Sequence, residues 1–152
     1  MLLGLISDTH GQIRAEALAA LHGVDMILHA GDVGAHSVLR ELGALAPVHA
    51  VRGNTDGSEL GLPRVFDMTV DGLTIHVSHG DELGSPTPDS LVHRYTADVI
   101  VYGHTHKPLI DTRSTTLIVN PGAAGPRRFN LMPSVGLLTI ENGRATAAII
   151  TL

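Results

Sequence analysis

The sequence of 152 residues contains no cysteine, no tryptophan and only two tyrosines and two phenylalanines. Without cysteine, the chain has no disulfide, no thiolate nucleophile and no cysteine ligand for a metal ion. Because aromatic residues make up 3% of the chain, there is little material on which bases could stack. The sequence therefore does not indicate a nucleotide-specific pocket.

Charged residues are also scarce, and basic ones are not in excess. They make up 16% of the sequence, with a formal net charge of −5 and a pI near 6.0. Binding to the backbone of nucleic acids depends on a basic face. The composition therefore argues against general nucleic-acid binding.

No hydrophobic run is long enough to cross a membrane. The opening run, residues 1–6, lacks a basic start and is interrupted by Asp8, so it is neither a signal peptide nor a membrane span. We therefore expect a cytoplasmic protein without a membrane segment. The 43% apolar content is typical of a globular protein, and the length predicts a single domain over residues 1–152.

Apolar runs bounded by turn residues predict strands alternating with helices, followed by strand pairs. The predicted strands cover residues 1–6, 25–28, 48–51 and 99–102, and the predicted helices cover residues 12–21, 36–42 and 88–95. Thr87 before Pro88 is a typical helix start. Two hairpins are predicted, 65–70 with 73–77 across Asp71-Gly72, and 134–140 with 145–152 across Asn142-Gly143. The pattern indicates an α/β fold with a second, more antiparallel sheet.

Potential metal ligands follow the predicted strands, next to glycines. They are Asp8, His10, Asp32, Asn54, His79, His104 and His106. The ends of parallel strands meet at one edge of a sheet, so we expect these side chains to lie close together. Oxygen and nitrogen donors suit Mn²⁺, Fe²⁺, Ni²⁺, Zn²⁺ or Mg²⁺. Seven candidates are too many for one zinc ion, but they fit two ions that share a carboxylate.

These groups and their order in the chain resemble the motifs of a known family. The five motifs are Asp8-Thr9-His10, Gly31-Asp32, Gly53-Asn54, His79-Gly80 and Gly103-His104-Thr105-His106. In this order they resemble the motifs of the calcineurin-like metallophosphoesterase superfamily. With Thr55-Asp56 after Asn54 and a late Asn120-Pro121-Gly122, the chain is similar to the small bacterial and archaeal phosphodiesterases, a branch that includes retromer-subunit relatives. This resemblance implies a four-layer α-β-β-α sandwich with two mixed β-sheets and the metals at one edge.

The resemblance also implies how two divalent ions would be held. One ion would bind Asp8, His10, Asp32 and His106, and the other would bind Asp32, Asn54, His79 and His104. Asp32 would then bridge the two ions. A hydroxide bridging the ions would be the nucleophile, and no catalytic residue is expected beyond the metal ligands. Manganese is the first choice of metal, with Ni²⁺, Fe²⁺, Zn²⁺ or Mg²⁺ as alternatives.

One position departs from the superfamily pattern. Larger metallophosphatases usually carry a histidine after the motif asparagine, and this chain has Thr55. Threonine is not a general acid near neutral pH, and such an acid accelerates a reaction by about 10²- to 10⁴-fold. Diesters and activated leaving groups depend on it less, so the sequence favours phosphodiesterase activity on a small phosphate ester.

Further residues are assigned supporting roles. Arg52 and Arg127, with Asn54 and Thr55, are predicted to contact the substrate, because an arginine fork suits phosphate oxygens. Solvated loop charges are the other interpretation of Arg127 and its neighbour Arg128. Asp56 and Asp81 are predicted to accept hydrogen bonds from the metal-binding imidazoles.

Two other functions remain open at this point. The same centre could serve a phosphomonoesterase or nucleotide hydrolase, or the chain could be a metal-binding scaffold for protein contacts. A complete set of seven ligands argues against a pure scaffold, which has no need of it. Small relatives suggest a homodimer or homotetramer.

Overall fold

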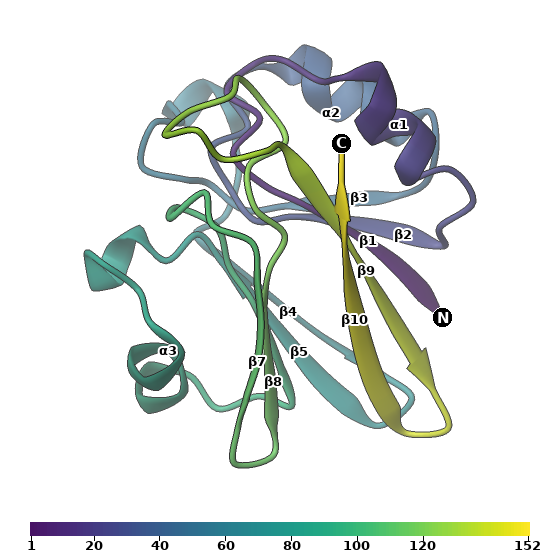
Figure 1. The fold of residues 1–152 in the computed structure, drawn as a ribbon, viewed down its shortest axis with the longest axis vertical. Coiled ribbons are helices and arrows are strands. Elements are labelled where there is room, and N and C mark those ends of the chain that lie inside the picture. The colour runs from purple at the N-terminus through teal and green to yellow at the C-terminus, as the bar shows by residue number, and fades with distance from the viewer.

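Two five-stranded sheets form the centre of the protein in the computed structural model, which describes residues 1–152 (Figure 1). The first sheet has the order β10-β9-β1-β2-β3, and the second has the order β4-β5-β6-β8-β7. The first sheet contains β1 (Leu2–Ile6), β2 (Met26–His29), β3 (Val48–Ala50), β9 (Ser134–Glu141) and β10 (Arg144–Thr151). The second contains β4 (Val65–Val70), β5 (Leu73–Ser78), β6 (Val99–Val101), β7 (Leu109–Arg113) and β8 (Thr116–Asn120).

Three short α-helices cover the outer faces of the sheets. Helices α1 (Ala15–Ala20) and α2 (His36–Gly43) lie on the first sheet, and α3 (Pro88–Arg94) lies on the second (Figure 1). Two single 3₁₀ turns, η1 (Ser58–Leu60) and η2 (Asp81–Leu83), lie in the connecting loops. The predicted α/β class and the four-layer α-β-β-α sandwich with two mixed sheets are confirmed. None of the helices combines the length and the apolar character needed to cross a bilayer.

The layers follow from the alternation of apolar side chains along each strand. In β1, Leu3 and Leu5 are buried in the core between the sheets, whereas Ile6 packs in the core under α1 and α2. In β6, Val99 belongs to the core between the sheets and Ile100 packs in the cluster under α3. Successive side chains of a strand point to opposite faces, so a continuous apolar run is buried on both sides.

Parallel pairing at the centre of each sheet determines where the loops lie. In the first sheet, β1 pairs in parallel with β2, and β2 with β3. In the second sheet, β5 pairs in parallel with β6, and β6 with β8. The carboxyl ends of these strands therefore lie along one edge of each sheet, which is where open α/β sheets hold ligands.

Both predicted hairpins are confirmed, with two left-handed residues in each turn. The backbone φ angles are 49° at Asp71 and 79° at Gly72, and 51° at Asn142 and 69° at Gly143. A third hairpin, β7 with β8, was not predicted. It turns around Ser114, whose φ is 54°. No Asn-Gly or Asp-Gly pair marks this turn, so the usual sequence signal is missing.

The first predicted helix is shorter than its apolar pattern indicated. The prediction of 12–21 is corrected to Ala15–Ala20. The residues before it form a loop, in which Gly11 has a φ of 82° and the N–H of Gln12 donates to the carbonyl of Thr9.

The predicted start of α3 gives a test of local stability. Thr87 accepts a hydrogen bond from the Ser90 N–H, and the Ser90 hydroxyl accepts one from the Thr87 N–H. Replacing Thr87 with alanine should lower the free energy of unfolding by about 1 kcal/mol, because one helix N–H loses its partner. Urea unfolding measures this change, and Thr115→Ala, at an exposed position in the β7–β8 turn, is the control. An unchanged midpoint in Thr87→Ala would contradict the capping role.

Candidate metal centre

The seven predicted ligands reach one place from both sheets. Loops after β1, β2 and β3 of the first sheet carry Asp8, His10, Asp32 and Asn54. Loops after β5 and β6 of the second sheet carry His79, His104 and His106. The first sheet therefore brings all the oxygen donors, and the second sheet brings only imidazoles.

Left-handed backbone conformation is concentrated at these residues. Positive φ angles occur at Asp8 (53°), His10 (48°), Asp32 (53°), His104 (68°) and His106 (61°). Aspartate and histidine tolerate this region better than most residues, although it remains uncommon. Such strain is typical of functional sites, where the surrounding structure holds the backbone in place.

Asp8, His10 and His106 form the first of two groups. The Nε2 atom of His106 lies 3.2 Å from Oδ1 of Asp8 and 3.4 Å from Nε2 of His10. The distance between His10 Nε2 and Asp8 Oδ1 is 3.9 Å. Three donor atoms from two loops thus face a common point.

Asn54, His79 and His104 form the second group, with Asp32 between the two. Oδ1 of Asn54 lies 3.1 Å from His79 Nε2 and 3.1 Å from His104 Nδ1. Oδ2 of Asp32 lies 3.3 Å from His79 Nε2 and 3.8 Å from His10 Nε2. A single carboxylate oxygen therefore faces both groups.

The spacing and the burial of these atoms fit divalent cations. Two ligands about 2.1 Å from one ion in a tetrahedral site are about 3.4 Å apart, close to the separations found here. Oδ1 of Asp8 is buried and has no hydrogen-bond partner. A buried, unpaired carboxylate oxygen is costly unless a positive charge compensates it. Two sets of side chains are compact enough to hold a metal ion. One is Asp8 with His10 and His106, and the other is Asp8 with Asp32 and His79.

The charges in the cluster depend strongly on one another. Burial lowers the pKa of His79, but the hydrogen bond with Asp32 and the negative charge of Asp8 outweigh it and raise this pKa to about 9. For Asp32, burial raises the pKa, but His79 and the Thr55 N–H more than compensate, so the pKa lies well below its usual value. Because an imidazole that binds a metal is neutral, a cation here would take the place of the His79 proton.

Each key ligand is held by a hydrogen bond on its other side. His79 donates from Nδ1 to the carbonyl of Ala30 at 2.7 Å, which leaves Nε2 facing the carboxylates. Oδ1 of Asp32 accepts the backbone N–H of Thr55 at 3.0 Å. Orientation by such outer contacts strengthens metal binding.

Ser7 was missed by sequence reasoning, and it orients Asp8. Its hydroxyl donates to Oδ2 of Asp8 at 2.5 Å, and the N–H of His104 donates to the same oxygen at 3.2 Å. These two bonds leave Oδ1 facing the imidazoles. The only signal for Ser7 was its place immediately before the first motif.

Two further buried side chains tie the loops together. The amide nitrogen of Asn120 donates to the Gly103 carbonyl at 2.9 Å and to the Thr105 hydroxyl at 3.0 Å. His29 accepts the Gly31 N–H at Nδ1 and donates from Nε2 to the Thr9 hydroxyl at 2.9 Å. Burial lowers the pKa of His29 to about 4, so this imidazole is neutral at neutral pH. Neither residue faces the cluster; both set the loop geometry.

Two glycines are required by the close approach of ligands. A Cβ at Gly53 would overlap Oδ1 of Asp32, and a Cβ at Gly103 would overlap the Ser7 hydroxyl. The motif glycines therefore leave room for the carboxylates and their partners.

The structure places Asp56 and Asp81 away from the imidazoles. The Asp56 carboxylate accepts the N–H groups of Val33, Gly34 and Gly53, at 3.1, 2.8 and 2.9 Å. It thus joins the loop after Asp32 to the loop that carries Asn54. Asp81 instead pairs with Arg64 at 3.0 Å.

Outside the cluster, the predicted substrate contacts are Thr55, Arg52 and Arg127. Thr55 and Arg127 are exposed, Arg52 is half-buried, and no ion pair joins either arginine to the seven ligands. Arg127 and Arg128 line a crevice beside His106. On the other side, His104 borders a groove of about 440 Å³ that also contains Tyr102 and Lys107.

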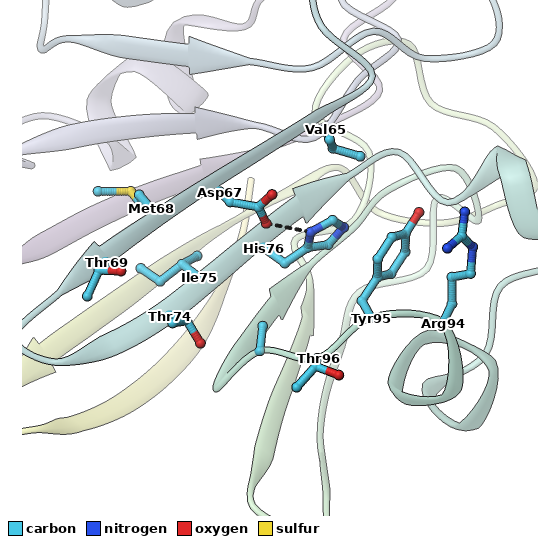
Figure 2. Close-up of a pocket in the computed structure, with 11 residues that line it drawn as sticks. Val65, Asp67, Met68, Thr69, Thr74, Ile75, His76, Arg94, Tyr95 and Thr96 are labelled. Atoms are coloured by element: carbon cyan, nitrogen blue, oxygen red, sulfur yellow. Dashed lines mark hydrogen bonds and ion pairs between the residues drawn. The ribbon is translucent and has the colours of Figure 1, made fainter.

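A cavity of about 610 Å³ lies elsewhere, between β4, β5 and the end of α3 (Figure 2). It contains none of the seven predicted ligands. Its polar centre is His76, whose Nδ1 lies 2.7 Å from Asp67 and whose ring stacks on Tyr95 with centroids 3.8 Å apart (Figure 2). Arg94 lies beside Tyr95, with its guanidinium carbon 5.3 Å from the ring centroid. Without converging ligands, this cavity is a weaker candidate for phosphoester chemistry than the cluster.

Sequence comparisons agree with the geometry. The model of the Calcineurin-like phosphoesterase superfamily domain matches residues 1–143. The chain is 37% identical over 163 residues to a probable metallophosphoesterase of Methanothermobacter thermautotrophicus, covering 99% of this chain and 92% of that protein. It is 25% identical to a phosphodiesterase of Methanocaldococcus jannaschii, covering 93% of this chain and 94% of the relative.

The fold also resembles that of solved structures. Vps29 from Entamoeba histolytica, in complex with zinc, superimposes with a TM-score of 0.83 at 23% identity, covering 99% of each chain. This likeness concerns the fold.

The bonds of Asp56 lead to a test of loop positioning. Asp56→Ala removes the acceptor of three backbone N–H groups, and we expect the affinity for Mn²⁺ to fall by about 10- to 100-fold. Isothermal titration calorimetry on metal-stripped protein measures this loss. Asp71→Ala is the matched control, because Asp71 accepts the Gly143 N–H far from the cluster. Equal Mn²⁺ affinities in a folded Asp56→Ala protein and in the wild type would show that the three bonds do not position the site.

Proposed function

This chain belongs to the calcineurin-like phosphoesterase superfamily, and from that membership we propose that it hydrolyses small phosphodiesters with two divalent metal ions. The observation that carries the proposal is Oδ2 of Asp32, which faces His79 at 3.3 Å and His10 at 3.8 Å. A carboxylate placed between two groups of donors suits a pair of ions better than a single one.

Each side chain has a part in this proposal. Asp8, His10, Asp32 and His106 would hold one ion, and Asp32, Asn54, His79 and His104 the other. When bound, the ions supply positive charge for the phosphoryl oxygens and a bridging hydroxide as the nucleophile. Manganese is our first choice of metal. Because donor sets of oxygen and nitrogen accept several divalent ions, Ni²⁺, Fe²⁺, Zn²⁺ and Mg²⁺ are the alternatives. The zinc complex of the Entamoeba Vps29 is consistent with a metal site in this fold.

The negative charge of the site is limited to two carboxylates. Asp8 and Asp32 are the only acidic members of the cluster, and Asn54 contributes a neutral carbonyl oxygen. This composition keeps the site open to an anionic substrate, because a third carboxylate would repel the phosphate. Arg127, which lines the crevice beside His106, would attract the phosphate by its charge.

The environment of Thr55 supports a diester as the substrate. Its backbone N–H serves Asp32, and its exposed side chain supplies no group that titrates near neutral pH. The leaving group therefore receives no proton from this position. A cytoplasmic location and a homodimer or homotetramer stay predictions.

The first prediction compares two substrates. Metal-stripped protein supplied with Mn²⁺ should hydrolyse bis-p-nitrophenyl phosphate with a higher kcat/KM than p-nitrophenyl phosphate. Without added metal, it should hydrolyse neither substrate. Release of p-nitrophenol measures both rates. A preference for the monoester would favour the alternative of a phosphomonoesterase or nucleotide hydrolase.

A gain of function tests the same point in the opposite direction. Thr55→His keeps the backbone bond to Asp32 and adds a group that can donate a proton. Hydrolysis of phenyl phosphate, whose leaving group needs a proton, should rise by about tenfold or more. An unchanged rate in a Mn²⁺-loaded variant would argue against the explanation of the diester preference.

The third prediction concerns the shared carboxylate. Asp32→Asn keeps the shape of the side chain but removes its charge, and we expect turnover to be lost and fewer than two Mn²⁺ ions to bind per chain. Metal analysis and circular dichroism separate lost binding from lost folding. His22→Ala, at an exposed position near the end of α1, is the control and should behave as the wild type. Near-normal turnover in Asp32→Asn would sink the two-metal assignment, and metal binding without turnover of any ester would favour a scaffold.

A further inference from the structure

Phe129 is the most exposed large apolar side chain of the protein. Its exposed fraction is 80%, whereas the other strongly exposed apolar residues lie between 42% and 50%. The remaining three aromatic residues are packed: Phe66 stacks on His49, Tyr95 stacks on His76, and Tyr102 is buried. Packing therefore does not account for the phenylalanine at this position.

The backbone at Phe129 is also unfavourable for its side chain. The N–H of Leu131 donates to the Arg128 carbonyl, and between them Phe129 and Asn130 have φ angles of 55° and 58°. Turns with two left-handed residues favour asparagine, aspartate or glycine, and a bulky residue there is uncommon. The turn displays an aromatic ring where neither burial nor turn chemistry favours one.

The loop that carries this turn is docked against the metal cluster. The N–H of Gly125 donates to the carbonyl of Asp8 at 3.2 Å, and the guanidinium of Arg14 donates to the Gly125 carbonyl through two nitrogens, both at 3.2 Å. A Cβ at Gly125 would overlap the carbonyl oxygen of Thr9. At its other end the loop is closed by the N–H of Ser134, which donates to the Ala123 carbonyl. The two ends of the loop are therefore held relative to the first motif.

Phe129 consequently lies beside a predicted metal ligand. Its ring centroid is 6.2 Å from that of His106, with the ring planes at 62°. The two rings meet at an edge, so they are not stacked on each other. Arg128, the preceding residue, lines the crevice beside His106.

We propose that Phe129 and Arg128 form a subsite that binds a planar aromatic group of the phosphodiester, such as a nucleobase. Aromatic rings accept the face of any base, and an adjacent arginine adds an attraction to both the phosphate and the ring system. This inference rests on the proposed function and names the class of ester that the centre takes. It also revises the expectation from composition that there is no pocket for a nucleotide. The chain has only four aromatic residues, but one of them, Phe129, lies beside His106.

A pair of substrates with the same leaving group separates this subsite from the chemistry. Bis-p-nitrophenyl phosphate retains an aryl group on phosphorus after cleavage, and methyl p-nitrophenyl phosphate retains a methyl group. With Mn²⁺, the ratio of kcat/KM for the aryl substrate to that for the methyl substrate should be about tenfold higher in the wild type than in Phe129→Asn, which is within the range that base stacking on an aromatic side chain contributes. Phe129→Asn should keep the rate on the methyl substrate, whereas Phe129→Tyr should retain the wild-type ratio.

Binding without turnover gives a second readout. Phenylphosphonate and methylphosphonate carry the same anionic group, so their affinities for the Mn²⁺-loaded protein differ only through the organic group. Calorimetry should show tighter binding of phenylphosphonate to the wild type by about tenfold, and equal binding of the two to Phe129→Asn. Ile110→Ala, which shortens an exposed apolar side chain on β7, is the matched control and should keep the wild-type ratio.

Stability distinguishes recognition from a structural role. Asparagine suits the left-handed turn, so Phe129→Asn should unfold at the same temperature as the wild type or at a higher one. A lower Tm together with a loss of both activities would overturn the proposal, as would a changed oligomeric state, which would make Phe129 a contact between copies of the chain. Equal rates and affinities for aryl and methyl ligands in the wild type would overturn the subsite and leave the phosphodiesterase in place. Failure to cleave the methyl substrate or to bind either phosphonate would overturn both.

Discussion

The site depends on the contacts that the Asp32 carboxylate makes with its two oxygens. One oxygen is fixed by the N–H of Thr55, and the other faces His79 and His10. This arrangement links the loop after β2 to the loop after β3 and to the second sheet. It also explains the charge balance, because the Asp32 carboxylate accounts for much of the raised pKa of His79. A cation in place of that proton would keep the same geometry, and its positive charge would compensate the negative charge of the carboxylates.

Packing of the two sheets is the condition for this interaction. Carboxylates and the amide come from the first sheet, and three of the four imidazoles come from the second. Neither sheet holds a complete set, so the core between them, with Leu5 of β1 and Val101 of β6, determines the distances between donors. That core also maintains the left-handed backbone at Asp8, Asp32 and His104, since isolated loops would relax from it.

In our proposal, chemistry and recognition are carried by different parts of the fold. The ligands leave the ends of buried central strands, where the backbone is fixed by ladder hydrogen bonds. Arg127, Arg128 and Phe129 lie on a loop that precedes β9 and is connected to the cluster through Gly125. Loops of this kind vary without cost to the core, so the same centre can serve different esters in different members of a fold.

By itself, the sequence determined the α/β class, the two Asn-Gly and Asp-Gly hairpins, the α3 start and the set of residues that meet at the strand ends. These depend on local patterns: period-two burial, turn residues and a capping pair. Tertiary structure alone decided which donors face each other, that Asp56 binds backbone N–H groups rather than imidazoles, and that Ser7 and Asn120 hold the loops. It also decided that β7 and β8 pair and that Phe129 lies beside His106. These contacts join residues far apart in the chain, and their distances are set by how the two sheets pack, which no local pattern encodes.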